Sequence, residues 1–135
     1  MTIEETLELE FQRATSLRDN GDLGGARELL EHLAEEYPDA FGVWLVLGDV
    51  QTSQSDYEAA ERSFTVAISL RPESELASLA MFHTLNHLRR ADDAFDEMRR
   101  FLTIRPQSPE YRVLLREMDE GLRIREMGED PPDDE

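Results

Sequence analysis

Residues 44–72 read WLVLGDVQTSQSDYEAAERSFTVAISLRP. Apolar side chains recur here at steps of three and four residues, which predicts two amphipathic helices joined by a short polar turn. Pro72 would end the second helix because proline lacks the N–H that a helix needs. Small residues in both helices would let them approach closely, and larger residues would fill the seam. The seam positions are Trp44, Leu47, Gly48, Ala60, Phe64 and Ala67.

The same register recurs through the chain with a period of 34 residues. Three sets of residues obey this step, namely Pro38, Pro72 and Pro106; Ala26, Ala60 and Ala94; and Leu30, Phe64 and Met98. The outer copies are degenerate, since the position of Trp44 holds Glu10 in the first copy and Ser78 in the third. A short helical repeat cannot bury its apolar face alone, so about three copies are needed for a stable stack.

The spacings W-x2-L-G, A-x3-F and P within residues 44–72 resemble the tetratricopeptide repeat. One family residue is missing, because Gln51 stands where an aromatic is expected three residues after Gly48. The resemblance extends over residues 3–126. It implies an all-α fold, a right-handed α-solenoid of three helix–turn–helix repeats followed by a capping helix.

We expect a single domain over residues 1–128 of this 135-residue chain. The predicted segments are repeats at about 7–40, 41–74 and 75–108, a capping helix at about 109–127, and a tail at 129–135. The tail contains five acids and two prolines in seven residues, a composition typical of disorder.

Polar residues before the apolar runs predict where the helices begin. Thr2 with Glu5 and Ser55 with Glu58 fit the capping box, in which a hydroxyl and a carboxylate satisfy free N–H groups. Single N-caps are assigned to Asp22, Asp39 and Ser108.

Composition limits the classes of function. The net charge is −17, and all 14 basic residues are arginine. Phosphate contacts need clustered basic residues, so we expect no nucleic-acid partner. The chain has no cysteine, and no apolar run suggests a signal peptide or membrane span. A cytoplasmic protein without membrane association is the expectation.

The resemblance implies that the first helices of successive repeats line a concave groove for a peptide or helix. The groove positions taken from the resemblance are Phe11, Leu45, Leu79 and Val113 in an apolar row, Thr15, Asp49, His83 and Glu117 in a second row, and Thr52, Leu76 and Asn86 beside them. The alternative is that the apolar row belongs only to the edge of the core.

The predicted groove is acidic. Arg18 stands there against six carboxylates, from Glu8, Asp19, Asp49, Glu110, Glu117 and Glu120. The best-known peptide-binding members of the family clamp a carboxylate with Lys, Asn and Arg, which this sequence does not provide. Apolar side chains edged by acids favour a partner with apolar anchors and basic flanks. The alternative is that the acids only keep the surface soluble.

His83 and His87 are four residues apart and would share a helix face, with Asp49 on the neighbouring repeat. Such a pair can bind a divalent metal, but no HExxH arrangement accompanies it, so a polar groove wall is preferred. No nucleophile elbow, Cys–His pair or glycine-rich phosphate loop is present. We therefore expect no enzyme, no cofactor and no metal site.

The function that follows is non-catalytic protein–protein interaction, as an adaptor or cochaperone-like scaffold. Self-association through the degenerate end repeats, giving a homo-oligomer, is the alternative, and metal binding through the two histidines is a weaker one. Self-association would use exposed apolar residues at the end of the stack, which the sequence suggests are Phe82, Phe95, Phe101 or Met118.

Overall fold

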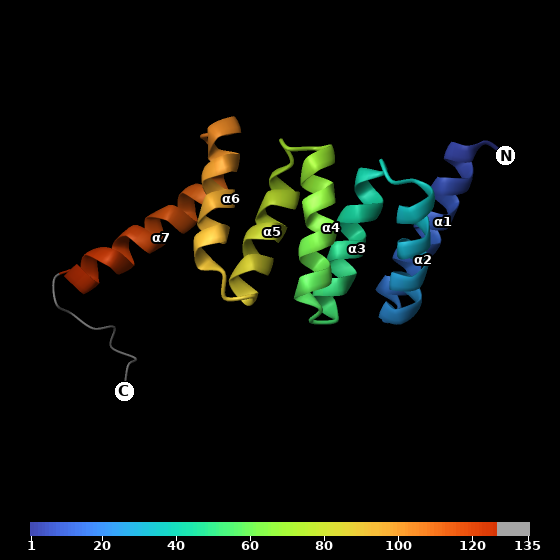
Figure 1. The fold of residues 1–135 in the computed structure, drawn as a ribbon, viewed down its shortest axis with the longest axis horizontal. Coiled ribbons are helices and arrows are strands. Elements are labelled where there is room, and N and C mark those ends of the chain that lie inside the picture. Colours follow the sequence, from blue (N-terminus) through green and yellow to red (C-terminus); the bar gives the residue numbers. More distant parts are fainter. Residues whose placement is uncertain (127–135) are drawn as a thin grey trace.

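The computed structural model describes residues 1–126 of the chain, and the side chains of residues 1–120. Seven α-helices follow one another in this part: α1 (Ile3–Asp19), α2 (Leu23–Glu36), α3 (Phe41–Ser53), α4 (Tyr57–Leu70), α5 (Glu75–His87), α6 (Ala91–Ile104) and α7 (Pro109–Glu126). Figure 1 shows them in a row, with α1 and α7 at opposite ends. The predicted all-α repeat stack is confirmed. The predicted tail lies outside the described residues.

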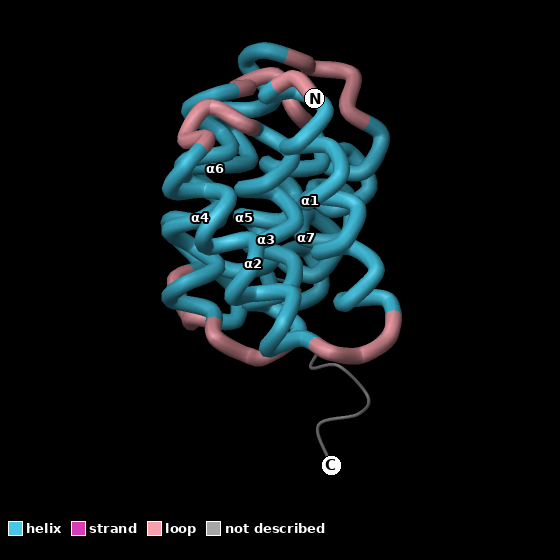
Figure 2. The backbone as a smooth tube through the Cα atoms, turned by 90° about the vertical axis from the view of Figure 1, so that its right-hand side faces the viewer, coloured by secondary structure: helices cyan, strands magenta, loops and turns pink. Residues whose placement is uncertain are grey.

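The helices form three hairpins, α1 with α2, α3 with α4 and α5 with α6, and each hairpin packs on the next through α2–α3 and α4–α5. The first helices of the hairpins also contact one another, α1 with α3 and α3 with α5. These added contacts place the first helices on the inner side of the stack. Figure 2 looks along the row from its N-terminal end, so that the helices overlap in projection.

The predicted caps are partly confirmed. Thr2 and Glu5 form the capping box of α1, and Asp22 accepts the N–H of Gly25 at the start of α2. The assignment of Asp39 is wrong, because α3 begins after Ala40 with no side-chain cap. The assignment of Ser55 is wrong too, because Asp56 caps α4 by accepting the N–H of Ala59.

A left-handed residue occupies the turn inside every hairpin. Gly21, Ser55 and Arg89 have φ angles of 88°, 60° and 60°, and they are 34 residues apart in sequence. This conformation suits glycine, whereas a side chain makes it costly. The residue after each of these three, Asp22, Asp56 or Arg90, is the N-cap of the next helix, so Ser55 lies one residue before the cap.

The core has two parts. The N-terminal part is centred on Ala14, Leu30, Leu33 and Val50, and the C-terminal part on Phe64, Phe82, Met98, Phe101 and Tyr111. α3 and α4 are tightly packed at Gly48, where an added Cβ would lie 2.5 Å from a ring carbon of Phe64. The predicted close contact of Gly48 with Phe64 is therefore present and leaves no room for a side chain at Gly48. Trp44 and Leu47, assigned to the same seam, pack with the N-terminal part of the core.

The ion pairs that join neighbouring hairpins lie at equivalent repeat positions, but the acidic and basic residues are exchanged. Arg27 of α2 contacts Asp56 at the start of α4, with Nη1 and Oδ2 2.9 Å apart. One period later, Glu61 of α4 contacts Arg90 at the start of α6, with Oε1 and Nη1 2.7 Å apart. Each pair joins a second helix to the turn of the following hairpin, and the basic and acidic partners have exchanged places.

The two junctions between hairpins differ at the position of Trp44. In the first junction, the Trp44 indole donates to the Pro38 carbonyl oxygen at 2.8 Å and lines a pocket of about 510 Å³ between α2 and α4. In the second junction this position holds Ser78, whose hydroxyl lies 2.6 Å from the carboxylate of Glu97 and 2.7 Å from the hydroxyl of Tyr111. The smaller residue therefore leaves space for a buried polar cluster.

Tyr111 attaches α7 to the stack. Its ring is fully buried, with centroids 5.7 Å from those of both Phe82 and Phe101. At the start of the helix the Ser108 hydroxyl donates to the Glu75 carboxylate, and Ser108 also accepts the N–H of Tyr111. Beyond these first turns α7 runs outward from α6 (Figure 1). α7 therefore covers the end of the stack only in part.

This attachment corrects one sequence-based expectation. Phe82 and Phe101, suggested as exposed contact residues, are 6% and 0% exposed because Tyr111 covers them. Phe95 is half-buried and Met118 is 37% exposed, so these two residues do remain accessible.

We expect stability to fall at alkaline pH through Tyr111. Burial raises the pKa of Tyr111 from its ordinary 10.0 to about 12. Between these values the unfolded chain has lost the phenolic proton while the folded protein keeps it, so folding stability decreases as pH rises, by about 1.4 kcal/mol per pH unit. Denaturant titrations across this range should show a shallower decline for Tyr111→Phe. Parallel declines in both proteins would contradict the assignment.

Candidate functional site

The inner side of the stack carries an apolar pocket where α1, α3 and α5 meet. It measures about 250 Å³, and its lining residues are Arg18, Leu45, Val46, Asp49, Leu76 and Ala80. Leu45 and Asp49 were both predicted groove residues, and the structure brings them together one turn apart on α3. The pocket therefore combines an apolar floor with one acidic and one basic side chain.

A second, smaller pocket lies between the N-terminal halves of α1 and α3. It measures about 190 Å³ and is lined by Leu7, Glu8, Phe11, Ala40, Gly42 and Val43. Phe11 was predicted at the groove, and its ring end lies against Gly42, where an added Cβ would be 3.7 Å away. The inner side thus offers two apolar pockets on the same helix pair, each with a carboxylate among its lining residues.

Three other predicted groove residues make hydrogen bonds or packing contacts within the protein. The hydroxyl of Thr15 donates to the Gln12 carbonyl at 2.9 Å, and that of Thr52 donates to the Gly48 carbonyl at 2.8 Å. Leu79 is half-buried and packs against the C-terminal part of the core. These residues line neither of the two pockets and contribute little beyond the shape of the surface.

The remaining predicted residues lie apart from the pockets. His83, Asn86 and Glu117 are exposed, and so is Val113, which shows 45% of its surface on α7. The structure therefore gathers the predicted row at its N-terminal end, around Phe11 and Leu45, and does not continue it as one floor to α7.

The two histidines do not form a metal centre with neighbouring ligands. His87 stacks on Tyr57 with ring centroids 4.4 Å apart, and His83 lies edge-on to Phe82 at 5.5 Å. Asp49, the third ligand considered, is paired with Arg18 at 3.6 Å. Among the residues that the structure describes, no group of three His, Cys, Asp or Glu side chains is placed to hold an ion.

Arg18 partly neutralises the acidic inner side. Its guanidinium contacts Asp19 at 3.0 Å and Asp49 at 3.6 Å. The other carboxylates assigned to the groove are exposed at Glu8, Glu110, Glu117 and Glu120. The field over the pockets is therefore negative, which favours cationic groups on whatever approaches.

Two residues of the larger pocket were not predicted. Val46 and Ala80 line it beside Leu45 and Leu76, whereas Leu79, one full period after Leu45, lines neither pocket. Successive hairpins are rotated relative to each other, so a residue one period on is not the one directly opposite. Leu76, which was predicted beside the groove, leaves 65% of its surface exposed.

None of the helices within residues 1–126 has both the length and the apolar character of a bilayer span.

Comparison with known proteins agrees with this architecture. Residues 11–75 match the family model described as tetratricopeptide repeat. A search of curated protein sequences finds no match.

Solved structures of similar fold include complexes. The Yersinia enterocolitica type III secretion chaperone SycD, in complex with a peptide of the translocator YopD, is 15% identical, with a TM-score of 0.73 over 92% of this chain and 95% of that one. The first TPR of Spaghetti (RPAP3), bound to the HSP90 peptide SRMEEVD, is 14% identical, with a TM-score of 0.73 over 88% and 97%. The MamA RS-1 ArsTM double mutant is 16% identical, with a TM-score of 0.69 over 78% of this chain. This chain spans 59% of its length.

Proposed function

Because this chain belongs to the tetratricopeptide repeat family, we propose that it is a non-catalytic interaction module that binds a segment of a partner protein on its inner side. Two proteins of similar fold, SycD and Spaghetti (RPAP3), are known with peptides bound. The fold alone does not assign a partner. The surface of this chain itself therefore indicates what it can bind.

The observation that carries the proposal is the pair of apolar pockets around α3. Leu45, Val46, Leu76 and Ala80 surround the larger one, and Leu76 leaves 65% of its surface exposed at the edge. A side chain entering this pocket would cover Leu76 and Leu45 together. Burial of apolar surface contributes about 25 cal/mol per Å², so one aliphatic or aromatic anchor would supply much of the affinity.

Charge suggests what flanks the anchor. The exposed carboxylates of Glu8 and Asp49 line the two pockets, and the chain as a whole carries −17. A partner segment with Lys or Arg beside its apolar anchors would gain from this field, and an acidic peptide would be repelled. The HSP90 peptide bound by Spaghetti contains two glutamates, so we propose a different class of ligand for this chain.

The wider role that fits this surface is that of an adaptor or cochaperone-like scaffold, which we place in the cytoplasm. Such a protein holds a partner segment in reach of other proteins without chemistry of its own. No catalytic constellation enters the proposal.

The test uses fluorescent peptides with two apolar anchors and either basic or acidic flanks. Basic-flanked peptides should bind at least about tenfold more tightly, and added salt should reduce the difference. Leu76→Asp should weaken binding by about tenfold or more, because it places a charge in the pocket wall without touching the core. The double variant Leu45→Asp/Leu76→Asp should show no measurable binding.

Leu9→Asp provides the matched control. Leu9 is an apolar residue of α1 with 52% of its surface exposed, and it lines neither pocket. The control should bind like the wild type. The proposal is wrong if Leu9→Asp loses as much affinity as Leu76→Asp, or if acidic flanks are preferred.

A further inference from the structure

The pocket between α2 and α4 lies on the outer side of the stack and is larger than either inner pocket. It measures about 510 Å³, and α3 contributes Trp44, Leu47 and Gln51 to its floor. Ala34 of α2 and Val66 of α4 belong to its two walls. None of these residues lines an inner pocket, so this space has no part in the proposed binding of a partner segment.

The identity of Gln51 explains why this space is open. The repeat pattern places an aromatic residue here, three positions after the glycine, while the pattern residues Trp44 and Leu47 are both present. A glutamine side chain is smaller than an aromatic one, and its Oε1 is bonded to the Ser63 hydroxyl of α4 at 2.6 Å. The pocket therefore includes space that an aromatic ring at this position would fill.

The amide nitrogen of Gln51 is a hydrogen-bond donor without a partner in the described part of the chain. Gln51 is only 4% exposed, and its bonded side-chain atom is Oε1. No fully enclosed side-chain nitrogen or oxygen among the described residues lacks a partner. The nitrogen is therefore open to the pocket that Gln51 lines, and an acceptor that satisfies it has to lie inside this pocket.

The second junction closes the equivalent surface with its own side chains. One period after Val66 stands Arg100, whose guanidinium crosses from α6 to the Pro72 carbonyl oxygen, 3.1 Å away. The carboxylate of Glu97 accepts from the same guanidinium at 2.7 Å. Val66 is too short and too apolar to make this bridge. The first junction therefore stays open above its buried donor.

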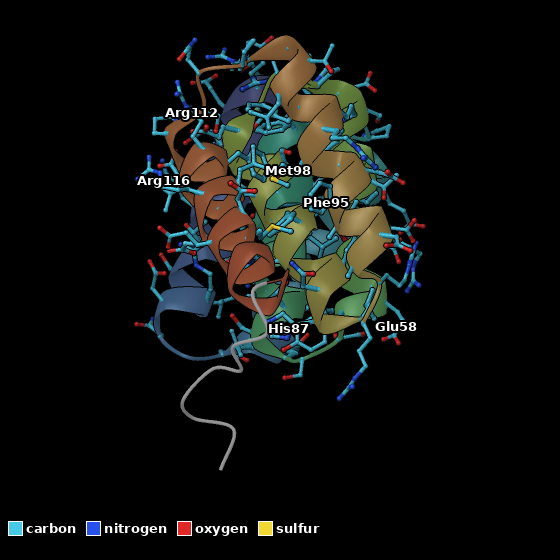
Figure 3. The ribbon with its side chains drawn as sticks, turned by 90° about the vertical axis from the view of Figure 1, so that its left-hand side faces the viewer. Glu58, His87, Phe95, Met98, Arg112 and Arg116 are labelled. Carbon is cyan, nitrogen blue, oxygen red and sulfur yellow. The ribbon has the colours of Figure 1, made fainter. Side chains whose placement is uncertain are left out.

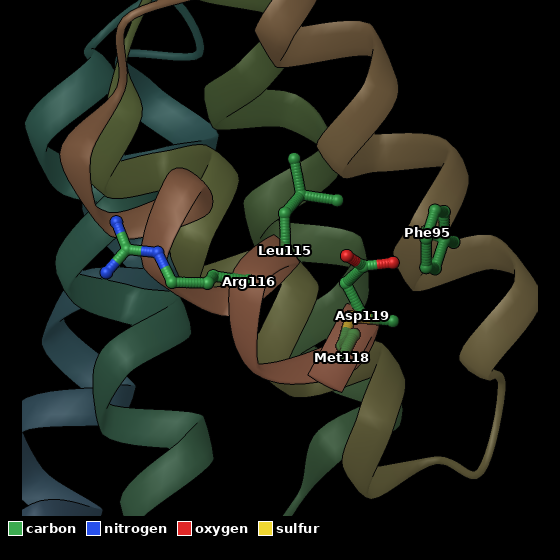
Figure 4. Close-up of a pocket in the computed structure, with 5 residues that line it drawn as sticks. All are labelled: Phe95, Leu115, Arg116, Met118 and Asp119. Atoms are coloured by element: carbon green, nitrogen blue, oxygen red, sulfur yellow. The ribbon is translucent and has the colours of Figure 1, made fainter. Parts of the chain in front are cut away.

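The pocket between α6 and α7, at the C-terminal end of the stack, has no comparable donor. Figure 3 views this end and shows Arg112 and Arg116 extending from α7 into solvent. Figure 4 shows the residues that line this pocket of about 380 Å³, which are Phe95, Leu115, Arg116, Met118 and Asp119. Its two polar residues, Arg116 and Asp119, are both exposed. Of these two pockets, only the one between α2 and α4 has a buried polar group in its lining.

The charges in the lining favour an uncharged ligand. Two arginines and two glutamates take part, namely Arg27, Glu31, Glu35 and Arg62. Arg27 is already paired with Glu31 at 3.1 Å and with Asp56 at 2.9 Å. A cation would meet both arginines and an anion both glutamates, and the net charge of −17 adds to the repulsion of anions.

We propose that this pocket binds a small uncharged aromatic molecule with one oxygen acceptor, of which a phenol is the simplest example. The ring would lie against Trp44 and Leu47, in the space of the missing aromatic residue, and the oxygen would accept from the Gln51 amide. A mainly apolar pocket of this volume with few polar groups is typical of small-molecule sites. The protein would then have a ligand site on the side of the stack opposite its peptide groove.

The test titrates the protein with p-cresol and with p-xylene, in which a methyl group of similar size replaces the hydroxyl. Trp44 is the only tryptophan of the chain, so the single indole N–H resonance in an NMR spectrum reports on this pocket. p-Cresol should shift this resonance with a dissociation constant of about 1 mM or lower. p-Xylene would cover the Gln51 amide without offering an acceptor, so it should bind at least about fivefold more weakly.

Two variants copy residues of the second junction. Gln51→Leu introduces the residue type of Leu85, one period later, and should remove the preference for p-cresol over p-xylene. Val66→Arg introduces the residue type of Arg100 and should prevent binding of both molecules by covering the pocket. The matched control is Val113→Arg, at an exposed valine of α7 outside the pocket, and it should bind like the wild type. Circular dichroism should show all three variants as helical as the wild type.

The charged analogues 4-methylbenzoate and 4-methylbenzylammonium should both bind more weakly than p-cresol. The inference is overturned if p-cresol leaves the indole resonance unchanged, if p-xylene or a charged analogue binds as tightly, or if Gln51→Leu keeps the preference. It is also overturned if Val113→Arg loses as much affinity as Val66→Arg, or if a capped glycyl-tyrosyl-glycine peptide binds more tightly than p-cresol. Basic-flanked peptides should still bind the inner side of Gln51→Leu and Val66→Arg, which separates this test from that of the proposed function.

Discussion

Tyr111→Ala is expected to detach α7 from the stack and to reduce the free energy of unfolding by about 3–5 kcal/mol, the usual cost of removing a buried aromatic ring. Tyr111 is fully buried between Phe82 and Phe101, and its hydroxyl meets Ser78. Removing the ring exposes both phenylalanines and leaves a cavity at the end of the core. Chemical denaturation would measure the loss, and hydrogen exchange along α7 would show where it occurs.

Tyr111→Phe separates the ring from its hydroxyl. This variant keeps the aromatic contacts and loses one hydrogen bond, worth about 1 kcal/mol. Ser78 retains its contact with Glu97 at 2.6 Å, so no buried hydroxyl is left without a partner. α7 should remain attached, with amide protection close to that of the wild type. Equal losses in the two variants would show that the polar cluster, rather than ring packing, holds α7.

Gly48→Ala is expected to destabilise the middle repeat by about 2 kcal/mol. A Cβ at this position would lie 2.5–2.8 Å from three carbons of the Phe64 ring, so the two helices must separate. We expect overpacking of this kind to cost about 3 kcal/mol, and the better helix propensity of alanine returns about 1 kcal/mol. Thermal and denaturant unfolding, compared with the wild type, would measure the net effect.

Gly24→Ala is the matched substitution, since Gly24 also lies in a helix but has nothing within 4 Å of an added Cβ. It should stabilise the protein by about 0.5–1 kcal/mol through helix propensity alone. Opposite signs for the two glycines would establish that close packing, rather than backbone freedom, explains Gly48. A stabilising Gly48→Ala would contradict the contact with Phe64.

The hairpin architecture could be predicted from sequence because its signals are local and repeated. Pro38, Pro72 and Pro106 each follow the end of a helix, and the small residues Gly48 and Ala60 lie where α3 meets α4. The 34-residue period and the residue types are therefore enough to predict the hairpins. The capping error at Ser55 has a different origin, because the turn holds Ser55 in a left-handed conformation that its residue type does not predict.

The residues of the candidate site were harder to predict from the sequence. The resemblance located Phe11, Leu45, Asp49 and Leu76 at the pockets. It did not include Val46 or Ala80, which line the larger pocket, and its Leu79 lines neither pocket. A period counts residues and does not give the rotation between successive hairpins.

The end of the stack was harder still to predict. The burial of Phe82 and Phe101 depends on Tyr111, and the space for Tyr111 depends on Ser78, which lies 33 residues earlier. Contacts between degenerate positions of this kind appear in no local pattern.

The exchanged ion pairs between hairpins bear on how such a protein can evolve. Duplicating the middle repeat in tandem would set Glu61 of one copy against Asp56 of the next, and deleting it would set Arg27 against Arg90. Either rearrangement opposes like charges at the new junction. The hairpins therefore have a fixed order, and the polarity of each junction acts against recombination that would lengthen or shorten the array.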